Sequence, residues 1–352
     1  MSDLLSPLDF TRGPSMKNRF MLAPLTNCQS HKDGTLSDDE FHWLTMRAKG
    51  GFGLTMTCAS HVQEIGKGFP GQLGIWGDRH LEGLTRLAST IRESDSIAIS
   101  QLHHAGMRSP EEVIGTAPIC PSDNEKTGAR GLSLDETKQL RDDFIEAAVR
   151  AEKAGFEGVE IHGAHGYVLC QYFSEGINLR NDEYGGDVDG RFRILFEIID
   201  GVRARCDKNF CVGVRLSPER FSMQLGEVLQ VAQRLMNEDK IDFLDLSLWD
   251  VFKEPVEEAY QGQSLMSHFV DLDRGNVRLG VAGNIRTPEQ AEQTLDAGAD
   301  WVMLGRAAML NHNFPLLYQE DRTFSPTPIP ASRDHLAEEG LSPTFIEYFS
   351  TN

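Results

Sequence analysis

Residues 158–167 read Gly-Val-Glu-Ile-His-Gly-Ala-His-Gly-Tyr, an apolar, β-prone run that passes directly into a loop rich in glycine and histidine. Amphipathic helical patterns flank this stretch, at Leu134–Ala154 before it and Arg191–Arg205 after it. Ser133, with Glu136 three residues later, is typical of the start of a helix. Strands that are joined by helices run parallel to one another, so the stretch predicts one unit of a parallel α/β fold.

The same alternation continues along almost the whole chain. Eight segments are predicted to be strands: Arg19–Leu25, Gly53–Ala59, Ser96–His103, Gly158–His162, Cys211–Leu216, Phe243–Leu248, Val277–Ala282 and Trp301–Leu304. Further helical patterns lie between them: Asp38–Lys49, Arg79–Glu93, Gly226–Asn237, Pro288–Ala297 and a poorly defined one around Ser264–Arg274. Eight such units close into a (β/α)8 TIM barrel. An open doubly wound sheet is the alternative, but no Gly-x-Gly-x-x-Gly follows the first strand, where a dinucleotide site would need it.

We predict a single domain over residues 1–352, because no linker or internal repeat divides the chain. Two connections are longer than a barrel requires: residues 105–133 after the third strand and 163–190 after the fourth. Both leave the carboxyl ends of strands, where barrel enzymes keep their active sites, so they are expected to border a pocket. Residues 324–352 form a C-terminal extension with a short helix around Pro343–Phe349.

Composition narrows the range of partners. The chain has 352 residues, with 34 Lys and Arg against 53 Asp and Glu, and a net charge of −19. This acidic excess argues against a nucleic acid or an anionic membrane as partner. No apolar run approaches the roughly 20 residues that cross a bilayer, and residues 1–20 lack a signal-peptide pattern, so we expect a cytoplasmic protein. The six cysteines include no Cys-x-x-Cys pair, which argues against an iron–sulfur or structural zinc site.

Polar residues at the predicted strand ends converge on one cavity. Gly283, Gly305 and Arg306 end the seventh and eighth strands, the usual phosphate site of a barrel, because glycine exposes backbone N–H groups and arginine donates two hydrogen bonds. The alternative is that Gly283 and Gly305 form only tight turns and that Arg306 is a surface charge. Arg215 lies within a buried strand and needs an anionic partner, so we expect negative charge inside the barrel.

His162, His165 and Tyr167 follow the fourth strand. Two imidazoles and a phenol can donate hydrogen bonds to a carbonyl or an anion, and tyrosine can transfer a proton. Two alternatives stay open at this point. The histidines could bind a metal ion with carboxylates, as in a metal-dependent barrel lyase or hydrolase, although no third ligand is evident. They could also stabilise a loop without any catalytic role.

Taken together, these motifs resemble the Old Yellow Enzyme family of FMN-dependent oxidoreductases, also called NADH:flavin oxidoreductases. The resemblance extends from Lys17 to about Pro315. It rests on the order and spacing of the following stretches: Ala23–Thr26, Leu73–Trp76, Gln101–Gly106, Gly158–Tyr167, Asn178–Gly186, Arg191, Arg193, Gly283 and Gly305–Arg306. One bacterial subgroup of the family has Cys in place of Thr26 and a substrate-facing Tyr in place of Cys28, so the pocket of this chain is expected to be roomier and less polar there.

The resemblance implies a non-covalently bound FMN. Residues implied to contact the flavin ring are Pro24, Leu25, Thr26, Ala59, Gln101 and Arg215, and those implied to hold the phosphate are Gly283, Gly305 and Arg306. His162 and His165 would bind the carbonyl or nitro oxygen of the oxidant, and Tyr167 would be the proton donor. No metal ligands are implied.

The implied reaction is a ping-pong, NADH- or NADPH-driven reduction of the C=C bond of α,β-unsaturated carbonyl or nitro compounds. Some members of the family instead oxidise an amine or a saturated ring, and they share the cofactor residues. Members are often homodimers or homotetramers, although no interface residue can be identified from this sequence.

Overall fold

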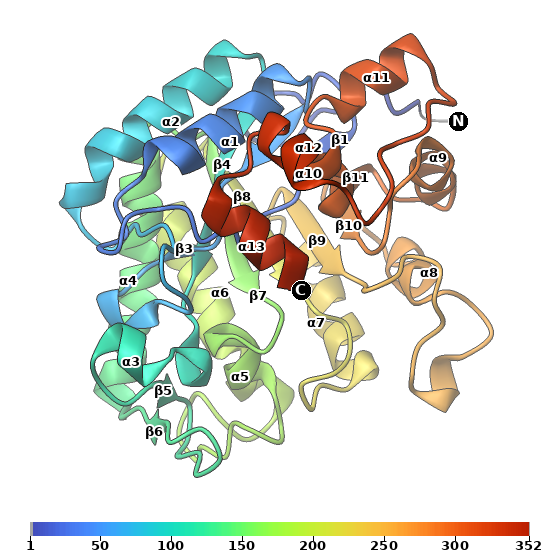
Figure 1. The fold of residues 1–352 in the computed structure, drawn as a ribbon. Coiled ribbons are helices and arrows are strands. Elements are labelled where there is room, and N and C mark those ends of the chain that lie inside the picture. The colour runs from blue at the N-terminus through green and yellow to red at the C-terminus, as the bar shows by residue number, and fades with distance from the viewer. Residues whose placement is uncertain (1–2, 352) are drawn as a thin grey trace.

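A computed structural model describes residues 3–351. Eight parallel strands form a closed ring, because the sheet order β2-β1-β11-β10-β9-β8-β7-β4 is completed by pairing of β2 with β4 (Figure 1). The strands are β1 (Phe20–Leu22), β2 (Leu54–Met56), β4 (Ile97–His103), β7 (Gly158–Gly163), β8 (Cys211–Leu216), β9 (Phe243–Ser247), β10 (Arg278–Ala282) and β11 (Trp301–Leu304). The predicted (β/α)8 barrel is confirmed, and each predicted strand overlaps one strand of the ring.

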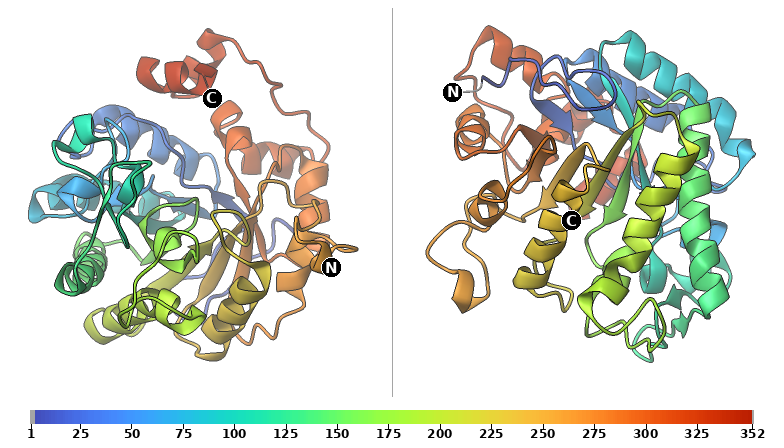
Figure 2. Two further views of the ribbon diagram at one scale, coloured as in Figure 1. Left: turned by 90° about the horizontal axis from the view of Figure 1, so that it is seen from below. Right: turned by 180° about the vertical axis from the view of Figure 1, so that it is seen from behind.

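Helices connect the strands around the outside of the ring (Figures 1 and 2). They are α1 (Asp38–Lys49), α2 (Leu81–Glu93), α4 (Leu134–Lys153), α6 (Val188–Arg205), α7 (Leu225–Asn237), α8 (Leu265–Val270) and α9 (Pro288–Asp296). The capping box that was predicted at Ser133 is present, since its side chain accepts from the backbone N–H of Glu136 and the Glu136 carboxylate accepts from that of Ser133. The helix predicted around Ser264–Arg274 is shorter than expected and ends at Val270.

The two long connections contain structure of their own. Residues 105–133 include α3 (Glu111–Ile114) and a small parallel pair, β5 (Ile119–Cys120) with β6 (Arg130–Gly131). Residues 163–190 include α5 (Val168–Phe173). Elsewhere, the two-residue strand β3 (Ser60–His61) extends the sheet beside β4. After β11 come α10 (Arg306–Leu310), α11 (Phe314–Glu320), α12 (Arg333–Glu338) and α13 (Pro343–Thr351). In Figure 1, α13 lies in front of the ring of strands, near its centre.

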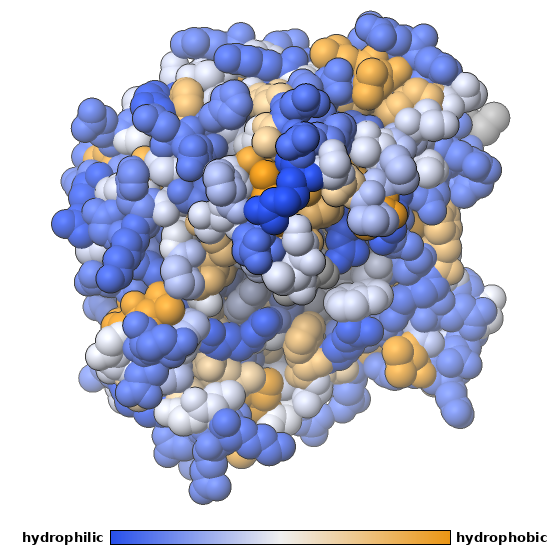
Figure 3. All heavy atoms as spheres, in the orientation of Figure 1, coloured by the Kyte–Doolittle hydropathy of each residue, from blue (hydrophilic) through white to orange (hydrophobic). Residues whose placement is uncertain are grey.

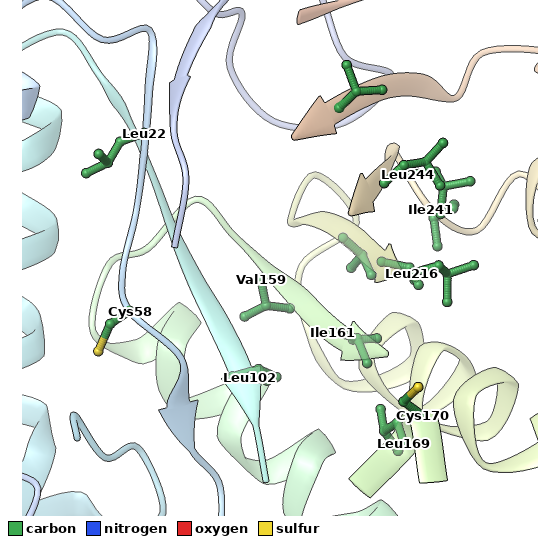
Figure 4. Close-up of a cluster of buried hydrophobic side chains, with 14 of the residues drawn as sticks. Leu22, Cys58, Leu102, Val159, Ile161, Leu169, Cys170, Leu216, Ile241 and Leu244 are labelled. Carbon is green, nitrogen blue, oxygen red and sulfur yellow. The ribbon is translucent and has the colours of Figure 1, made fainter. Parts of the chain in front are cut away.

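Side-chain alternation along the strands separates two apolar regions. Outward-facing residues such as Leu102, Val159, Ile161 and Leu216 are buried in the larger cluster, between the strands and the helices (Figure 4). The barrel interior holds a second cluster of twelve buried residues, which includes Met21, Ile99, Phe243, Trp301 and Met303. At Gly213, a Cβ would lie 2.0 Å from the ring of Phe243, so that interior position requires glycine. Apolar side chains therefore fill the amino-terminal half of the barrel interior, and the polar side chains lie towards the carboxyl ends of the strands.

Within residues 3–351, no helix is both long and apolar enough to span a membrane.

Candidate active site

A cavity of about 460 Å³ opens at the carboxyl ends of the strands. Ten residues implicated by the sequence line it: Pro24, Leu25, Thr26, Ala59, Gln101, His162, His165, Tyr167, Arg215 and Arg306. The surface is hollowed near the middle of the face that Figure 3 shows, beside the C-terminal segment. Of the remaining two, Gly283 lines an adjoining cavity of about 230 Å³, and Gly305 is the N-cap of α10, directly before Arg306. The topology thus brings together residues from positions 24 to 306.

The two histidines interact directly with each other. The backbone N–H of Ala164 donates to Nδ1 of His162 over 3.3 Å, so the proton of this neutral ring is on Nε2. That nitrogen lies 3.1 Å from Nδ1 of His165 and donates to it, which leaves Nε2–H of His165 as the outer donor of the pair. Burial lowers the pKa of both rings well below the ordinary value, and the neighbouring Arg215 lowers them further. Both imidazoles are therefore neutral hydrogen-bond donors at neutral pH.

Tyr167 is packed against these rings. His103 lies edge-on to it at 4.3 Å between ring centroids, and His162 lies edge-on at 5.3 Å. The guanidinium of Arg108 covers the tyrosine ring at 4.6 Å and also donates to the backbone oxygen of His165 over 2.6 Å. These contacts fix the phenol at the cavity wall. Arg108, in the loop 105–133, was not among the predicted site residues.

Arg215 and Gln101 are held by partners inside the barrel. Nε of Arg215 donates to Oγ of Ser247 over 2.8 Å, and its side chain borders both cavities. Nε2 of Gln101 donates to Oε2 of Glu160 over 2.5 Å, which fixes the orientation of its amide. Both side chains are almost completely buried, yet both reach the cavity. They lie where they could hydrogen-bond the polar edge of a heterocycle.

Two acidic side chains, Glu160 and Asp245, lie inside the barrel, where the sequence led us to expect negative charge. Both side chains are fully buried, and Asp245 is the register partner of Arg215 on the neighbouring strand. Burial raises the pKa of Asp245 well above its ordinary value, and the adjacent Glu160 raises it further, while Arg215 opposes the shift. Two carboxyl groups can hydrogen-bond to each other only when one of them is protonated. Among the described residues, Arg215 forms no direct ion pair with either acid, so it acts on Asp245 through space.

The raised pKa makes stability depend on pH in a defined direction. The unfolded chain releases the Asp245 proton near its ordinary pKa of about 3.9, whereas the folded chain retains it, so stability declines as pH rises towards the folded-state pKa. Asp245→Asn mimics the protonated form, so its melting temperature is expected to fall less than that of the wild type as the pH rises above about 4. Glu320→Gln, at an exposed carboxylate, is the control and should follow the wild type. Parallel pH profiles for Asp245→Asn and the wild type would contradict the buried shared proton.

The residues fit an anionic flavin cofactor. Arg215 and Arg306 place two positive charges at the cavity of a chain whose net charge is −19. At Gly283, a Cβ would approach the backbone nitrogen of Val251 to 2.9 Å, so the close contact of these two loops requires glycine. Phe69, Trp249 and Met309 add apolar surface to the same cavity. Within residues 3–351, no group of three or more His, Cys, Asp or Glu is placed to hold a metal ion.

Comparison with known proteins agrees with this arrangement. Residues 3–324 match the model of the NADH:flavin oxidoreductase / NADH oxidase family. The chain belongs to this family. The resemblance to the Old Yellow Enzyme family is thereby confirmed, and the protein is an FMN-dependent oxidoreductase that uses a nicotinamide.

Individual relatives cover nearly the full length. The chain is 32% identical over 330 residues to the probable NADH-dependent flavin oxidoreductase YqiG of Bacillus subtilis, which covers 91% of this chain and 88% of the relative. It is also 32% identical over 323 residues to an NADPH dehydrogenase of Bacillus cytotoxicus, covering 89% of this chain and 91% of that protein. The solved Old Yellow Enzyme homologue of Zymomonas mobilis superposes with a TM-score of 0.82 at 28% identity, covering 96% of this chain and 99% of the homologue.

Proposed function

We propose that this family member is an ene-reductase that reduces the C=C bond of α,β-unsaturated carbonyl or nitro compounds. The proposal rests on one observation. The His162–His165 pair, Tyr167 and Arg215 line the same cavity. Neutral imidazole N–H groups and a phenol suit the binding of a substrate oxygen and the delivery of a proton. They are less suited to accept a proton from an amine cation, because burial disfavours their protonation.

In the proposed mechanism, the outer N–H of His165, whose ring accepts a hydrogen bond from His162, binds the carbonyl or nitro oxygen of the substrate. This contact draws electron density from the β-carbon and stabilises the negative charge that develops on the oxygen during the reaction. When bound, FMN supplies the hydride for the β-carbon, having been reduced by NADH or NADPH. Tyr167 gives its hydroxyl proton to the α-carbon and regains one from solvent, so the C=C bond becomes a C–C bond with one hydride and one proton added.

Arg215 and Arg306 bind and tune the cofactor in this proposal. Reduction of a flavin leaves negative charge on its N1–C2=O edge, and the buried guanidinium of Arg215 would stabilise that charge. Thr26, Gln101, Ala59, Pro24 and Leu25 would contact the ring, and Gly283, Gly305 and Arg306 would hold the phosphate.

The reaction is tested by steady-state oxidation of NADH and NADPH with cyclohexenone or maleimide as oxidant. The proposal expects turnover that depends on the alkene, together with the saturated product. The alternative role, oxidation of an amine or a saturated ring, predicts that candidate amines reduce the flavin without any nicotinamide. Such reduction, combined with no turnover of either alkene, would contradict the proposal.

Arg306→Ala tests the phosphate assignment. Loss of a charge-assisted contact worth about 1.5–3 kcal/mol is expected to weaken FMN binding roughly 10- to 150-fold, measured from quenching of FMN fluorescence on binding to apoprotein. Arg333→Ala removes an equal charge from an exposed ion pair with Glu347 and should leave the affinity unchanged. Equal FMN affinity in the wild type and Arg306→Ala would contradict the assignment.

A further inference from the structure

Part of the cavity lining comes from residues beyond the region that the family model matches. Tyr348 and Phe349 line it together with His162, His165 and Tyr167. Both aromatic residues come from α13, whereas the family model ends at residue 324. In Figure 1, α13 crosses in front of the strands near the centre of the ring. A helix outside the matched region therefore contributes surface to the active site.

The position of α13 is fixed by buried contacts rather than by the cavity residues themselves. Phe345 is fully buried and packs edge-on against Trp43 of α1, with 5.3 Å between ring centroids. The backbone N–H of Ser342, just before the helix, donates to Oε1 of Gln29 over 3.0 Å, and Ile346 is also buried. These anchors hold the helix on α1 and on the loop that follows β1. The half-buried Tyr348 can consequently be changed without removing them.

Tyr348 reaches the side of the cavity formed by the loop after β1. Its hydroxyl hydrogen-bonds to the hydroxyl of Thr26, and burial raises its pKa above the ordinary value, so the phenol is neutral. Tyr167 and Cys28 are close enough to influence it electrostatically. The sequence predicted open, less polar space near Cys28, but the ring of Tyr348 occupies the border of this region. The prediction of a roomier pocket stays a prediction, and an aromatic ring from the opposite end of the chain lies at the edge of this region.

We propose that Tyr348 is a specificity-determining residue of this site, whose ring limits the size of the substrate that fits beside Thr26. The inference rests on the proposed function only in taking the ligand to be a small carbonyl compound. A pocket contact of this kind discriminates between ligands that differ by one or a few methyl groups by roughly 10- to 200-fold. The chain should therefore prefer compact cyclic ketones over substituted ones, and the preference should depend on the bulk of residue 348.

The test uses binding of saturated ketones, which do not accept hydride at a C=C bond, to the oxidised FMN enzyme. Dissociation constants for cyclohexanone and 3,3,5-trimethylcyclohexanone are measured from changes in the visible flavin spectrum. Tyr348→Ala is expected to reduce the preference for the smaller ketone about 10-fold or more. Tyr348→Phe keeps the ring and should keep the wild-type preference, and Glu347→Gln, at an exposed position of the same helix, is the matched control. Tyr348→Leu, which retains part of the bulk, should fall in between.

An unchanged preference in Tyr348→Ala would overturn the inference. A loss in Tyr348→Phe as large as that in Tyr348→Ala would overturn it as well, because the hydroxyl rather than the ring would then decide. The FMN dissociation constant and the melting temperature of each variant show whether α13 has stayed in place, and Tyr348→Leu replaces Tyr348→Ala if it has not. These ketones are not reduced at a C=C bond, so a failure of alkene reduction would leave the ketone preference, and the role of Tyr348, unaffected. Wild-type enzyme that binds neither ketone would contradict both proposals.

Discussion

Tyr167→Phe is expected to slow alkene reduction by about 10²- to 10⁴-fold, the usual contribution of a positioned general acid. The substitution removes only the hydroxyl, so the ring keeps its edge-on contacts with His103 and His162 and its position beneath the guanidinium of Arg108. The nicotinamide half-reaction needs no proton from this residue. Anaerobic stopped-flow absorbance should therefore show a normal rate of flavin reduction and a strongly reduced rate of flavin reoxidation by cyclohexenone.

The control for Tyr167→Phe must be a residue whose substitution leaves the site undisturbed. His103, which is buried and hydrogen-bonds to Gln72, does not meet this condition. Tyr260→Phe, at a tyrosine that does not line the cavity, is the matched control and should change neither half-reaction. Equal losses in both half-reactions of Tyr167→Phe would contradict a role as proton donor, since they would indicate a general disturbance of the site.

Arg215→Met is expected to lower the midpoint potential of the bound flavin by about 30–65 mV. This range corresponds to the loss of a charge-assisted hydrogen bond worth about 1.5–3 kcal/mol, at about 30 mV per 1.4 kcal/mol for a two-electron couple. The substitution also removes the cation that faces Asp245, so the apoprotein should be less stable at high pH than the wild type. The potential is measured by anaerobic titration against a reference dye.

Arg215→Lys separates charge from geometry. Lysine keeps the positive charge but lacks the planar guanidinium that donates to Ser247 and reaches the cavity at the same time. Its potential should lie between those of the wild type and Arg215→Met. A potential in Arg215→Met equal to that of the wild type would contradict the placement of this cation at the reduced edge of the flavin.

The barrel was predictable from the sequence because its strands and helices alternate with clear local signals. Period-two alternation also places Glu160 and His162 on the same face of one strand, and Asp245 on the same face as Phe243. The buried acid pair could therefore have been located from the sequence by aligning the strands. Trp249, which follows the sixth strand and lines the cavity, could have been found in the same way.

Other features could not be predicted because they depend on contacts between distant segments. Nothing near Tyr348 indicates that its helix returns to the loop after β1, since the packing of Phe345 on Trp43 joins residues about three hundred positions apart. The hydrogen bond between His162 and His165 depends on the left-handed backbone of His165, with φ of 61°, which the spacing of the two residues does not reveal.

The central claim is that the donors at this cavity activate an electron-poor alkene towards hydride. It is tested most directly by reducing the holoenzyme anaerobically with one equivalent of nicotinamide and mixing it with cyclohexenone, with maleimide or with air-saturated buffer. The account predicts that at least one alkene reoxidises the flavin faster than air does and yields the saturated product. Reoxidation by both alkenes that is no faster than reoxidation by air would contradict it.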